Sequence, residues 1–308
     1  MRSIINSVKN NHTFRKIFAA ALVFVVSAAL LTGCGSGSDA SGSDSSSSGS
    51  DSGSSDAVFR TLDEIKESGT VRIGVFSDKA PFGYVDENGE YQGYDVYFAK
   101  RIAEDMGVDV EFVSLDPAAR VDAVKAGKVD IVLANFTVTD ERAEQVDFAL
   151  PYMKVQLGVV SPDSAVITDV SQLEDGKELI IAKGTTAETY FETNYPDITL
   201  QKYDSYADAY NALLDGRGDA FSTDNTEVLA WANSNPGFTV GITALGDVDT
   251  IAPAVAKGNE TLLTWLNDEI KSLGEENFFH KDYEETLRDV YGDSANADDL
   301  VVEGGVLE

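Results

Sequence analysis

The stretch KAGKVDIVLANFTVTDERAEQVDFALPY, at 125–152, limits most strongly what this chain can fold into. After a glycine turn at Gly127 comes a short run of apolar, mostly β-branched residues that ends at Ala134. Such a run is typical of a buried strand in a parallel sheet. Polar residues follow it, and Thr139 is a good N-cap for a further helix. The stretch therefore predicts an α/β protein with polar side chains at the end of a buried strand.

Arg142 lies in the first turn of the predicted helix, where a cation opposes the helix dipole. Departures from such a local rule are expected at functional sites. The free N–H groups of the turn, the Thr137 hydroxyl and the Arg142 guanidinium could meet around one carboxylate, which an arginine binds through two parallel bonds. A surface ion pair of Arg142 with Glu141 or Glu144 explains the pattern equally well.

The N-terminus has the features of an export signal over residues 1–33. Basic residues precede an apolar run at 17–31 that is too short to span a membrane. The run ends in Leu-Thr-Gly-Cys34, which resembles the lipobox of bacterial lipoproteins and implies cleavage before Cys34 and lipid attachment to its sulfur. Residues 34–56 then form a Ser-, Gly- and Asp-rich tether. We expect the lipid alone to hold the folded body at the extracytoplasmic face of the cytoplasmic membrane.

Net charge limits the partners of the mature protein. Four basic residues leave with the signal, so the formal net charge falls from −30 to −34. A body this acidic repels nucleic acid and anionic lipid headgroups, and we expect neither as a partner. Because Cys34 is the only cysteine, the body contains no disulfide.

The two halves of the chain repeat one pattern. AVKAGKVDIVLANFT, at 123–137, is echoed by ALLDGRGDAFSTDN, at 212–225. Each combines a helix end, a glycine turn, a basic residue, an aspartate and a strand that ends in polar residues. The echo predicts two lobes built on one plan. We place lobe 1 at 57–154 plus 251–308 and lobe 2 at 155–250.

The two repeats lead to charges of opposite sign, Arg142 in the first lobe and Asp224 in the second. An α-amino acid presents a carboxylate and an ammonium side by side, and each is costly to bury unless it is paired. One lobe would then supply the cation and the other the anion, so that ligand binding would close the lobes.

Two further segments follow predicted strands and could reach such a site. The loop after the strand at 71–76 carries Phe82, which could form an aromatic wall of the crevice or simply pack. Gly184, Thr185 and Thr186 begin a helix, where hydroxyl and N–H groups suit an anion. Thr185 could instead be a plain N-cap without excluding ligand contact by Thr186.

The sequence gives little evidence of catalytic groups. Of the two histidines, His12 lies in the signal and His280 in a segment typical of packing. We recognise no nucleophile paired with a base, no phosphate-binding loop and no cluster of metal ligands. We expect neither an enzyme nor a cofactor or metal. The acidic tail from Asp293 onward is expected to be loose.

Several segments between residues 58 and 290 resemble the family 3 extracellular solute-binding proteins of amino-acid ABC transporters. They are APFGY, GYDV, AGKVDIVLANFTVTDER, VDFALPYM, KGTTAETYF and GRGDAFSTDN. The resemblance implies a periplasmic-binding-protein fold of type II, with two α/β lobes joined by two crossing strands. It also implies a monomer that presents an amino acid to permease subunits, with ATP hydrolysis on partner chains.

The resemblance further implies roles for individual residues. The matching positions are Arg142, Thr137, Arg120 and Thr186 for the ligand carboxylate, Asp224 and the Asn135 carbonyl for its ammonium, and Phe82 for its side chain.

Within the family, the run ANFTVTDERAEQVDFALPYMKV, with IAPAVAKG and FFHKDYEETL, is most similar to the cysteine-binding branch. This similarity implies a small polar amino acid as ligand, with cysteine first. Some relatives that bind acidic amino acids carry a lysine near Phe76, and its absence weighs against aspartate or glutamate without excluding them. The alternatives are a dehydratase-type enzyme on the same fold and a sensory ligand-binding domain.

Overall fold

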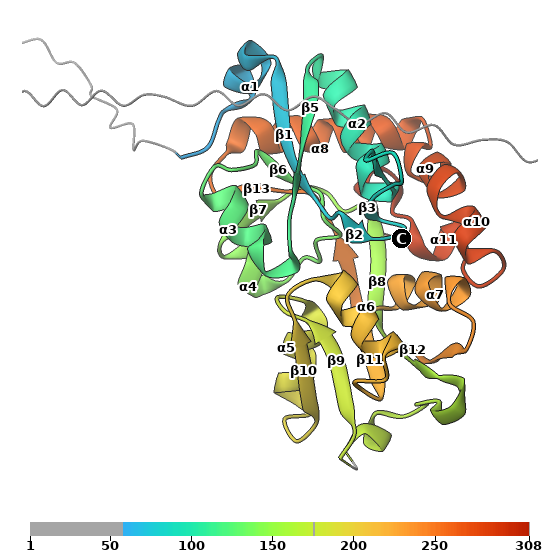
Figure 1. Cartoon of the computed structure of the whole chain (residues 1–308). Coiled ribbons are helices and arrows are strands. Elements are labelled where there is room, and N and C mark those ends of the chain that lie inside the picture. Colours follow the sequence, from blue (N-terminus) through green and yellow to red (C-terminus); the bar gives the residue numbers. More distant parts are fainter. Residues whose placement is uncertain (1–57, 175, 308) are drawn as a thin grey trace, which may run out of the picture. The chain divides into compact units, whose positions relative to one another are not determined.

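The computed structural model describes residues 58–174 and 176–307. The predicted signal, Cys34 and the tether lie outside this part of the chain. Within the described part, none of the helices has the length and apolar character that crossing a membrane requires. The described chain folds around two five-stranded sheets, which Figure 1 shows in two lobes.

The first sheet has the strand order β5-β1-β6-β13-β7. Its strands are β5 (Asp109–Ser114), β1 (Thr70–Val75), β6 (Ile131–Val132), β13 (Ala254–Ala256) and β7 (Val146–Phe148). β1 runs parallel to β5 and β6, whereas β13 is antiparallel to β6 and β7. The run at 129–134 is buried throughout, as its composition predicts, although only two of its residues form a regular strand. Ile131 and Val132 pack into different core clusters because successive side chains point to opposite faces of the sheet.

The helices of this lobe are α1 (Leu62–Ser68), α2 (Tyr94–Met106), α3 (Arg120–Lys125), α4 (Asp140–Ala143), α8 (Glu260–Glu275), α9 (Phe278–Thr286), α10 (Arg288–Tyr291) and α11 (Ala297–Leu300). Thr61 caps α1 through a reciprocal capping box with Glu64. Gly107 ends α2 with φ 75°, a left-handed conformation that glycine adopts without steric cost. A small sheet of β2 (Asp78–Lys79), β3 (Gly83–Val85) and β4 (Tyr91–Gln92) completes the lobe.

The second sheet has the order β10-β9-β11-β8-β12. Its strands are β10 (Thr199–Tyr203), β9 (Glu178–Ala182), β11 (Ala220–Asp224), β8 (Met153–Pro162) and β12 (Phe238–Ile251), and its helices are α5 (Thr186–Asn194), α6 (Tyr206–Leu214) and α7 (Asn225–Ser234). β11 is parallel to β9 and antiparallel to β8, just as β6 is parallel to β1 and antiparallel to β13. The two sheets therefore share one plan, as the sequence echo predicts.

Two chain segments connect the sheets and run side by side. β8 begins at Met153, which packs in the core of the first lobe, and farther along it pairs with β11 of the second. β12 ends at Ile251, and the chain returns to the first sheet through β13. The Tyr152 amide donates a hydrogen bond of 3.0 Å to the Ile251 carbonyl. The junction between the lobes is thus a pair of crossing segments, which suits a hinge.

The lobes also contact each other away from these crossings. One hydrophobic cluster contains side chains of both lobes, among them Phe76 and Val132 of the first and Tyr206 and Phe221 of the second. The Phe76 and Tyr206 rings pack edge to face, with 5.3 Å between their centroids. The structure is therefore a closed arrangement of the two lobes.

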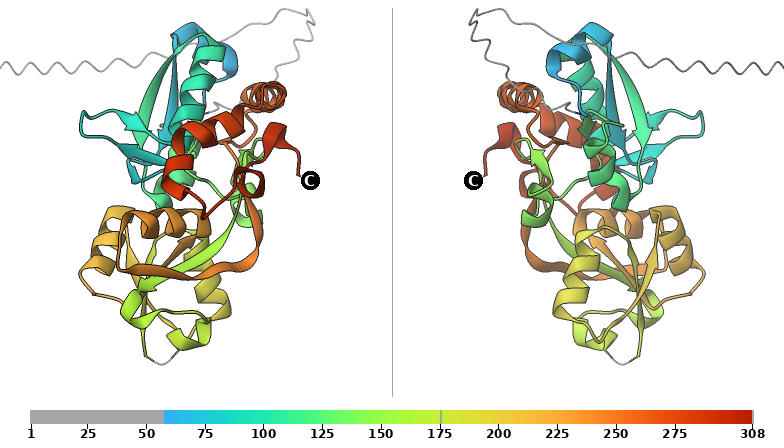
Figure 2. Two further views of the ribbon diagram at one scale, coloured as in Figure 1. Left: turned by 90° about the vertical axis from the view of Figure 1, so that its right-hand side faces the viewer. Right: turned by 90° about the vertical axis from the view of Figure 1, so that its left-hand side faces the viewer.

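The expectation of a loose tail after Asp293 is wrong. Figure 2 shows the final helices against the lobe that contains β1 and α2. Ala297, Val301 and Val302 are buried, and Val301 forms a β-bridge with Met153. The Glu303 carboxylate accepts a hydrogen bond from the His280 amide on α9. Three apolar side chains spaced along this acidic segment, together with Glu303, hold it against the lobe, and its net charge conceals that pattern.

Candidate functional site

The end of β6 places Asn135 at the boundary between the lobes. Asn135 has φ 44°, which is uncommon for a residue other than glycine. Its amide donates to Asp95 Oδ2 at 2.7 Å, and Asp95 Oδ1 accepts from the Tyr152 hydroxyl at 2.6 Å. Burial raises the pKa of Asp95 to about 7. This buried carboxyl therefore holds the strand end in its unusual conformation and ties it to the first crossing segment.

Arg142 projects from the single turn of α4 toward the second lobe. Thr139 caps the turn, as predicted, and its hydroxyl accepts from the Arg142 amide at 3.3 Å. The guanidinium donates to the Thr137 carbonyl at 2.7 Å and to the Gly184 carbonyl of the second lobe at 3.0 Å. Among the described residues Arg142 forms no ion pair with an acidic side chain, so the surface ion pair left open by the sequence is not found.

Arg120 lies beside Arg142 and is also bound by carbonyl groups. Its Nη1 donates to the Ala134 and Asn135 carbonyls at 3.0 and 3.1 Å, and its Nη2 donates to the Gly184 carbonyl at 3.0 Å. The side chain is 3% exposed and, within the described part of the chain, has no acidic partner within ion-pair distance.

Burial is the main cause that lowers the pKa values of the two arginines. Burial lowers the pKa of Arg120. Burial, and then the charge of Arg120, lowers the pKa of Arg142 to about 9. Carbonyl dipoles satisfy the N–H groups but do not cancel two net charges. The pair is therefore suited to an anion that would restore the balance.

The second lobe contributes the start of α5 to this side of the site. The Thr185 hydroxyl accepts from the Glu188 amide at 3.3 Å and donates to the Ala182 carbonyl at 2.7 Å, which makes Thr185 the N-cap of α5. Thr186 is the first residue of the helix and is half-buried. The Thr185 hydroxyl is thus engaged in capping. Thr186 lies two residues after Gly184, whose carbonyl both arginines contact.

Asp224, at the end of β11, is a buried carboxylate with one long ion pair among the described residues. It is 5% exposed, and its side chain does not cap the following helix α7. Its side-chain contact is with Lys79 of the first lobe, at 3.4 Å between Oδ2 and Nζ. Hydrogen bonds between an ammonium and a carboxylate are normally 2.7–2.9 Å. Asp224 can therefore accept a further, closer cation.

Lys79 is the charged residue that sequence reasoning missed, and the expectation that no lysine lies near Phe76 is wrong. Lys79 is 1% exposed and reaches from β2 into the second lobe. Its Nζ lies 2.8 Å from Glu227 Oε2 and 2.8 Å from Asn135 Oδ1. Burial opposes its charge, but Glu227 and Asp224 outweigh burial and raise the pKa of Lys79. Its position after a strand end was the available signal, because such positions line the crevice of α/β proteins.

Phe82 lies against this lysine. The side chain is fully buried, and its ring centroid is 5.7 Å from Lys79 Nζ. The Tyr206 ring of the second lobe lies on the same ammonium at 4.5 Å. Aromatic faces attract cations and exclude water. Phe82 therefore belongs to the wall of the site near Asp224, on the side away from solvent.

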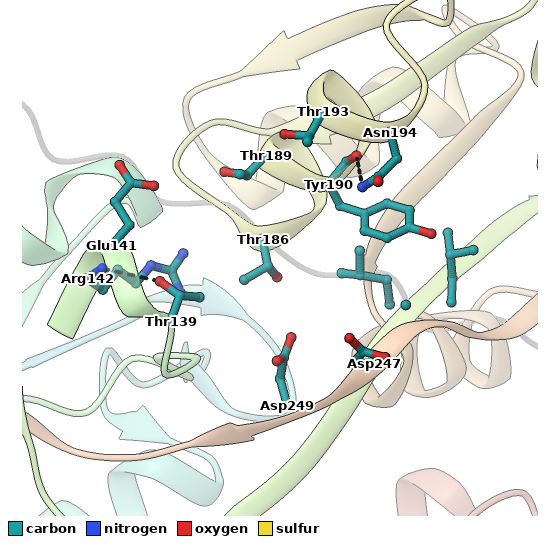
Figure 3. Close-up of a pocket in the computed structure, with 13 residues that line it drawn as sticks. Thr139, Glu141, Arg142, Thr186, Thr189, Tyr190, Thr193, Asn194, Asp247 and Asp249 are labelled. Atoms are coloured by element: carbon teal, nitrogen blue, oxygen red, sulfur yellow. Dashed lines mark hydrogen bonds between the residues drawn. The ribbon is translucent and has the colours of Figure 1, made fainter.

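A cavity of about 350 Å³ borders the arginine side of the site. Figure 3 shows Arg142 and Thr139 on one side, Thr186, Thr189 and Tyr190 of α5 on another, and Asp247 and Asp249 of β12 below. Asp224, Arg120 and Phe82 do not line this cavity. Of the predicted site residues, the cavity reaches only Arg142 and Thr186.

The chain is similar to several known proteins. The profile of the bacterial extracellular solute-binding proteins, family 3, matches residues 71–286. The crystal structure of the cysteine-binding protein from Campylobacter jejuni is 54% identical, covering 79% of this chain and 98% of that chain, with a TM-score of 0.77. That of the solute receptor for L-cysteine of Neisseria gonorrhoeae is 51% identical, covering 79% and 100%, with a TM-score of 0.78. The glutamine-binding protein GlnH of an ABC transporter in Bacillus subtilis is 28% identical over 280 residues, which are 89% of this chain and 98% of that protein. All three are binding proteins rather than enzymes.

Proposed function

We propose that this chain captures a small amino acid between its lobes and delivers it to the permease of an ABC importer. L-Cysteine is the preferred candidate for the ligand. The chain belongs to the bacterial extracellular solute-binding proteins of family 3. The fold is that of a type II periplasmic binding protein, and the protein is not an enzyme but a binding protein. The choice of cysteine is supported by two cysteine-binding proteins that are 54% and 51% identical to this chain.

One observation carries the proposal. Among the described residues Arg120 and Arg142 have no acidic partner within ion-pair distance, and the buried carboxylate of Asp224 forms one long ion pair. All three side chains lie where the lobes meet, because both arginines contact Gly184 and Asp224 contacts Lys79 across the boundary. A zwitterion would supply an anion to the arginines and a cation to Asp224, and so balance both groups at once.

The proposed roles follow from this charge arrangement. Arg142, Arg120, Thr137 and Thr186 take the carboxylate, Asp224 and Asn135 take the ammonium, and Phe82 and Thr185 support the pocket wall and the helix start. A bound carboxylate would replace neutral carbonyl acceptors of the guanidinium groups by an anion, which also neutralises their charge. Binding would then favour the closed form over the open one.

An acidic amino acid is the weaker candidate, although a lysine does lie near Phe76. Lys79 Nζ is already surrounded by Asn135, Glu227 and Tyr206 within 3.1 Å. An ammonium has three protons to donate, and these partners, together with Asp224 at 3.4 Å, already surround it. No donor of Lys79 therefore remains for a side-chain carboxylate of the ligand.

We also propose that the mature protein is a monomer held outside the cytoplasmic membrane by lipid on Cys34. The family is extracellular, and the lipobox-like segment and the tether support the anchor. Cell fractionation tests the anchor: the native protein should sediment with membranes, and the Cys34→Ser variant should not. Sedimentation of both with membranes would contradict it.

Calorimetry on the Arg142→Ala variant tests the binding site. Losing one partner of a buried charge pair costs about 2–5 kcal/mol, so affinity for L-cysteine should fall at least ~30-fold. Arg217→Ala is the matched control, because Arg217 is exposed and pairs with Asp215 at the surface of the second lobe. Equal affinity of the Arg142 variant and the control would overturn the assignment. Mass spectrometry of the small molecule that co-purifies with the native protein identifies the ligand independently.

A further inference from the structure

Four oxygen atoms surround the ammonium of Lys79, and their distances differ in an informative way. Asn135 Oδ1 and Glu227 Oε2 are both 2.8 Å from Nζ, and the Tyr206 hydroxyl is 3.1 Å away. Asp224 Oδ2 is the most distant, at 3.4 Å. The three nearer oxygens match the three protons of an ammonium. Lys79 is thus neutralised mainly by Glu227, and its contact with Asp224 is the longest of the four.

Glu227 is fixed in the place that this role requires. It lies on the first turn of α7, three residues after Asp224, and is fully buried. Its Oε1 accepts from the Tyr210 hydroxyl, and its Oε2 accepts from the Thr223 hydroxyl at 3.0 Å. Because donors of its own lobe hold both oxygens, the carboxylate is fixed in the position that meets Lys79 when the lobes close.

A buried ammonium needs a counter-charge, and the structure offers two carboxylates for it. Without Glu227, Asp224 would be the remaining acidic residue within ion-pair distance of Lys79 among the described residues. An Asp224 carboxylate drawn to Lys79 would be poorly placed for a ligand ammonium. Lys79 would then act as a tethered competitor of the ligand.

We propose that Glu227 is a positioning residue of the binding site: it takes up the charge of Lys79 and so keeps the Asp224 carboxylate available for the ammonium of an incoming amino acid. This inference rests on the proposed function, since it assigns to Asp224 the ligand ammonium. It adds a residue that does not itself contact the ligand.

At acid pH, protonation of Glu227 should end its neutralisation of Lys79. Burial raises the pKa of Glu227 to about 7. The charged or titratable groups that face it are Lys79 from β2, Tyr206 and Tyr210 from α6, Asp224 from β11 and Tyr291 from α10. A protonated Glu227 no longer neutralises Lys79. Affinity for an amino acid should therefore fall between pH 7.5 and 5.5, a range in which the groups of cysteine itself do not titrate.

The test compares L-cysteine with 3-mercaptopropionate, which lacks only the ammonium, in the wild type and in Glu227→Gln. We expect the variant to lose tenfold or more in affinity for L-cysteine and less than twofold for 3-mercaptopropionate. The decrease in L-cysteine affinity at acid pH should be present in the wild type and smaller in the variant. Equal losses for both compounds, or an unchanged pH profile, would overturn the proposal.

A double variant separates this role from a structural one. Lys79→Met combined with Glu227→Gln removes the competing cation, so affinity for L-cysteine should recover most of what Glu227→Gln loses. A merely structural role predicts further loss, since each substitution disturbs the core. Failure of the double variant to recover any affinity would contradict the proposal.

A structural measurement keeps the inference testable if cysteine is not the ligand. In a crystal structure of Glu227→Gln with its lobes closed, Lys79 Nζ should lie within 3.0 Å of Asp224. An unchanged separation near 3.4 Å would overturn the inference, whereas absence of L-cysteine binding by the wild type would overturn only the choice of ligand.

Discussion

Asn135 contacts both charged parts of the site, the arginine pair and the lysine beside Asp224. Its carbonyl accepts from Arg120, its side-chain oxygen accepts from Lys79, and its amide donates to Asp95. A left-handed conformation in a residue other than glycine costs about 1–3 kcal/mol and persists where the surroundings over-determine it. Here three hydrogen bonds hold it, and the strained residue lies between the arginines and Asp224.

Asp224 is the residue at which the ammonium assignment can be tested alone. Asp224→Asn keeps the shape of the side chain but removes its charge, so we expect at least a tenfold loss of affinity for L-cysteine. 3-Mercaptopropionate has no ammonium and should bind the variant and the wild type within twofold of each other. Calorimetry with both compounds measures the difference. Parallel losses would mean that Asp224 supports the fold of the site rather than the ligand.

Some residues of the site could be predicted from sequence because they stand in local patterns. Arg142 breaks a helix rule, and Asp224 ends a strand that echoes β6. Lys79 has only its position after a strand end, Glu227 has no such pattern, and a lysine is almost never fully buried unless it is paired. Their pairing joins positions 79 and 227 and exists only once the lobes close, so the linear sequence does not reveal it.

At the scale of elements, the sequence echo corresponds to a repeated atomic contact. Asp130 precedes β6 and its carboxylate accepts from the Arg72 amide of β1 at 2.8 Å. Asp219 precedes β11 and its carboxylate accepts from the Glu178 amide of β9, also at 2.8 Å. The shared aspartate thus fixes neighbouring strands in both lobes, which explains why the plan could be predicted. The short length of β6 and the docking of the tail could not, because tertiary contacts decide them.

A side chain at Gly184, in the loop between β9 and α5, would block closure of the two lobes. A Cβ there would lie 2.5 Å from the Ala118 Cα and 2.7 Å from its nitrogen, across the lobe boundary. The backbone at Ala118 cannot yield as a flexible side chain would. We therefore expect Gly184→Ala to reduce ligand affinity tenfold or more, and to abolish the decrease in radius of gyration that ligand causes in small-angle scattering of the wild type.

Gly216→Ala is the control for backbone strain. Gly184 and Gly216 both have left-handed φ, 74° and 68°, but a Cβ at Gly216 meets no atom within 4 Å. Both variants should lose similar stability from strain, while only Gly184→Ala should lose affinity. A similar affinity loss in both would attribute the effect to strain and not to closure.

Across the whole molecule, burial of carboxyl groups sets the pH dependence of stability. Burial raises the pKa of Asp95 and Glu227 to about 7 and raises that of Asp282 well above its usual value. In the unfolded chain these groups titrate near pH 4. Between pH 5.5 and 7.5 the folded state therefore binds more protons than the unfolded state, and the free energy of unfolding must fall as the pH rises.

Thermal unfolding of the ligand-free protein should accordingly show a higher Tm at pH 5.5 than at pH 7.5. A single group with a folded pKa near 7 contributes up to about 2 kcal/mol over this interval, and ~1 kcal/mol moves Tm by ~2–4 °C in a chain of this size. Protonation also relieves repulsion in an acidic body, but salt screens that effect between exposed charges. The difference in Tm should therefore persist in 0.5 M salt and shrink in Asp95→Asn and Glu227→Gln. A higher Tm at pH 7.5 would show that these carboxyl groups are ionised without cost in the folded protein.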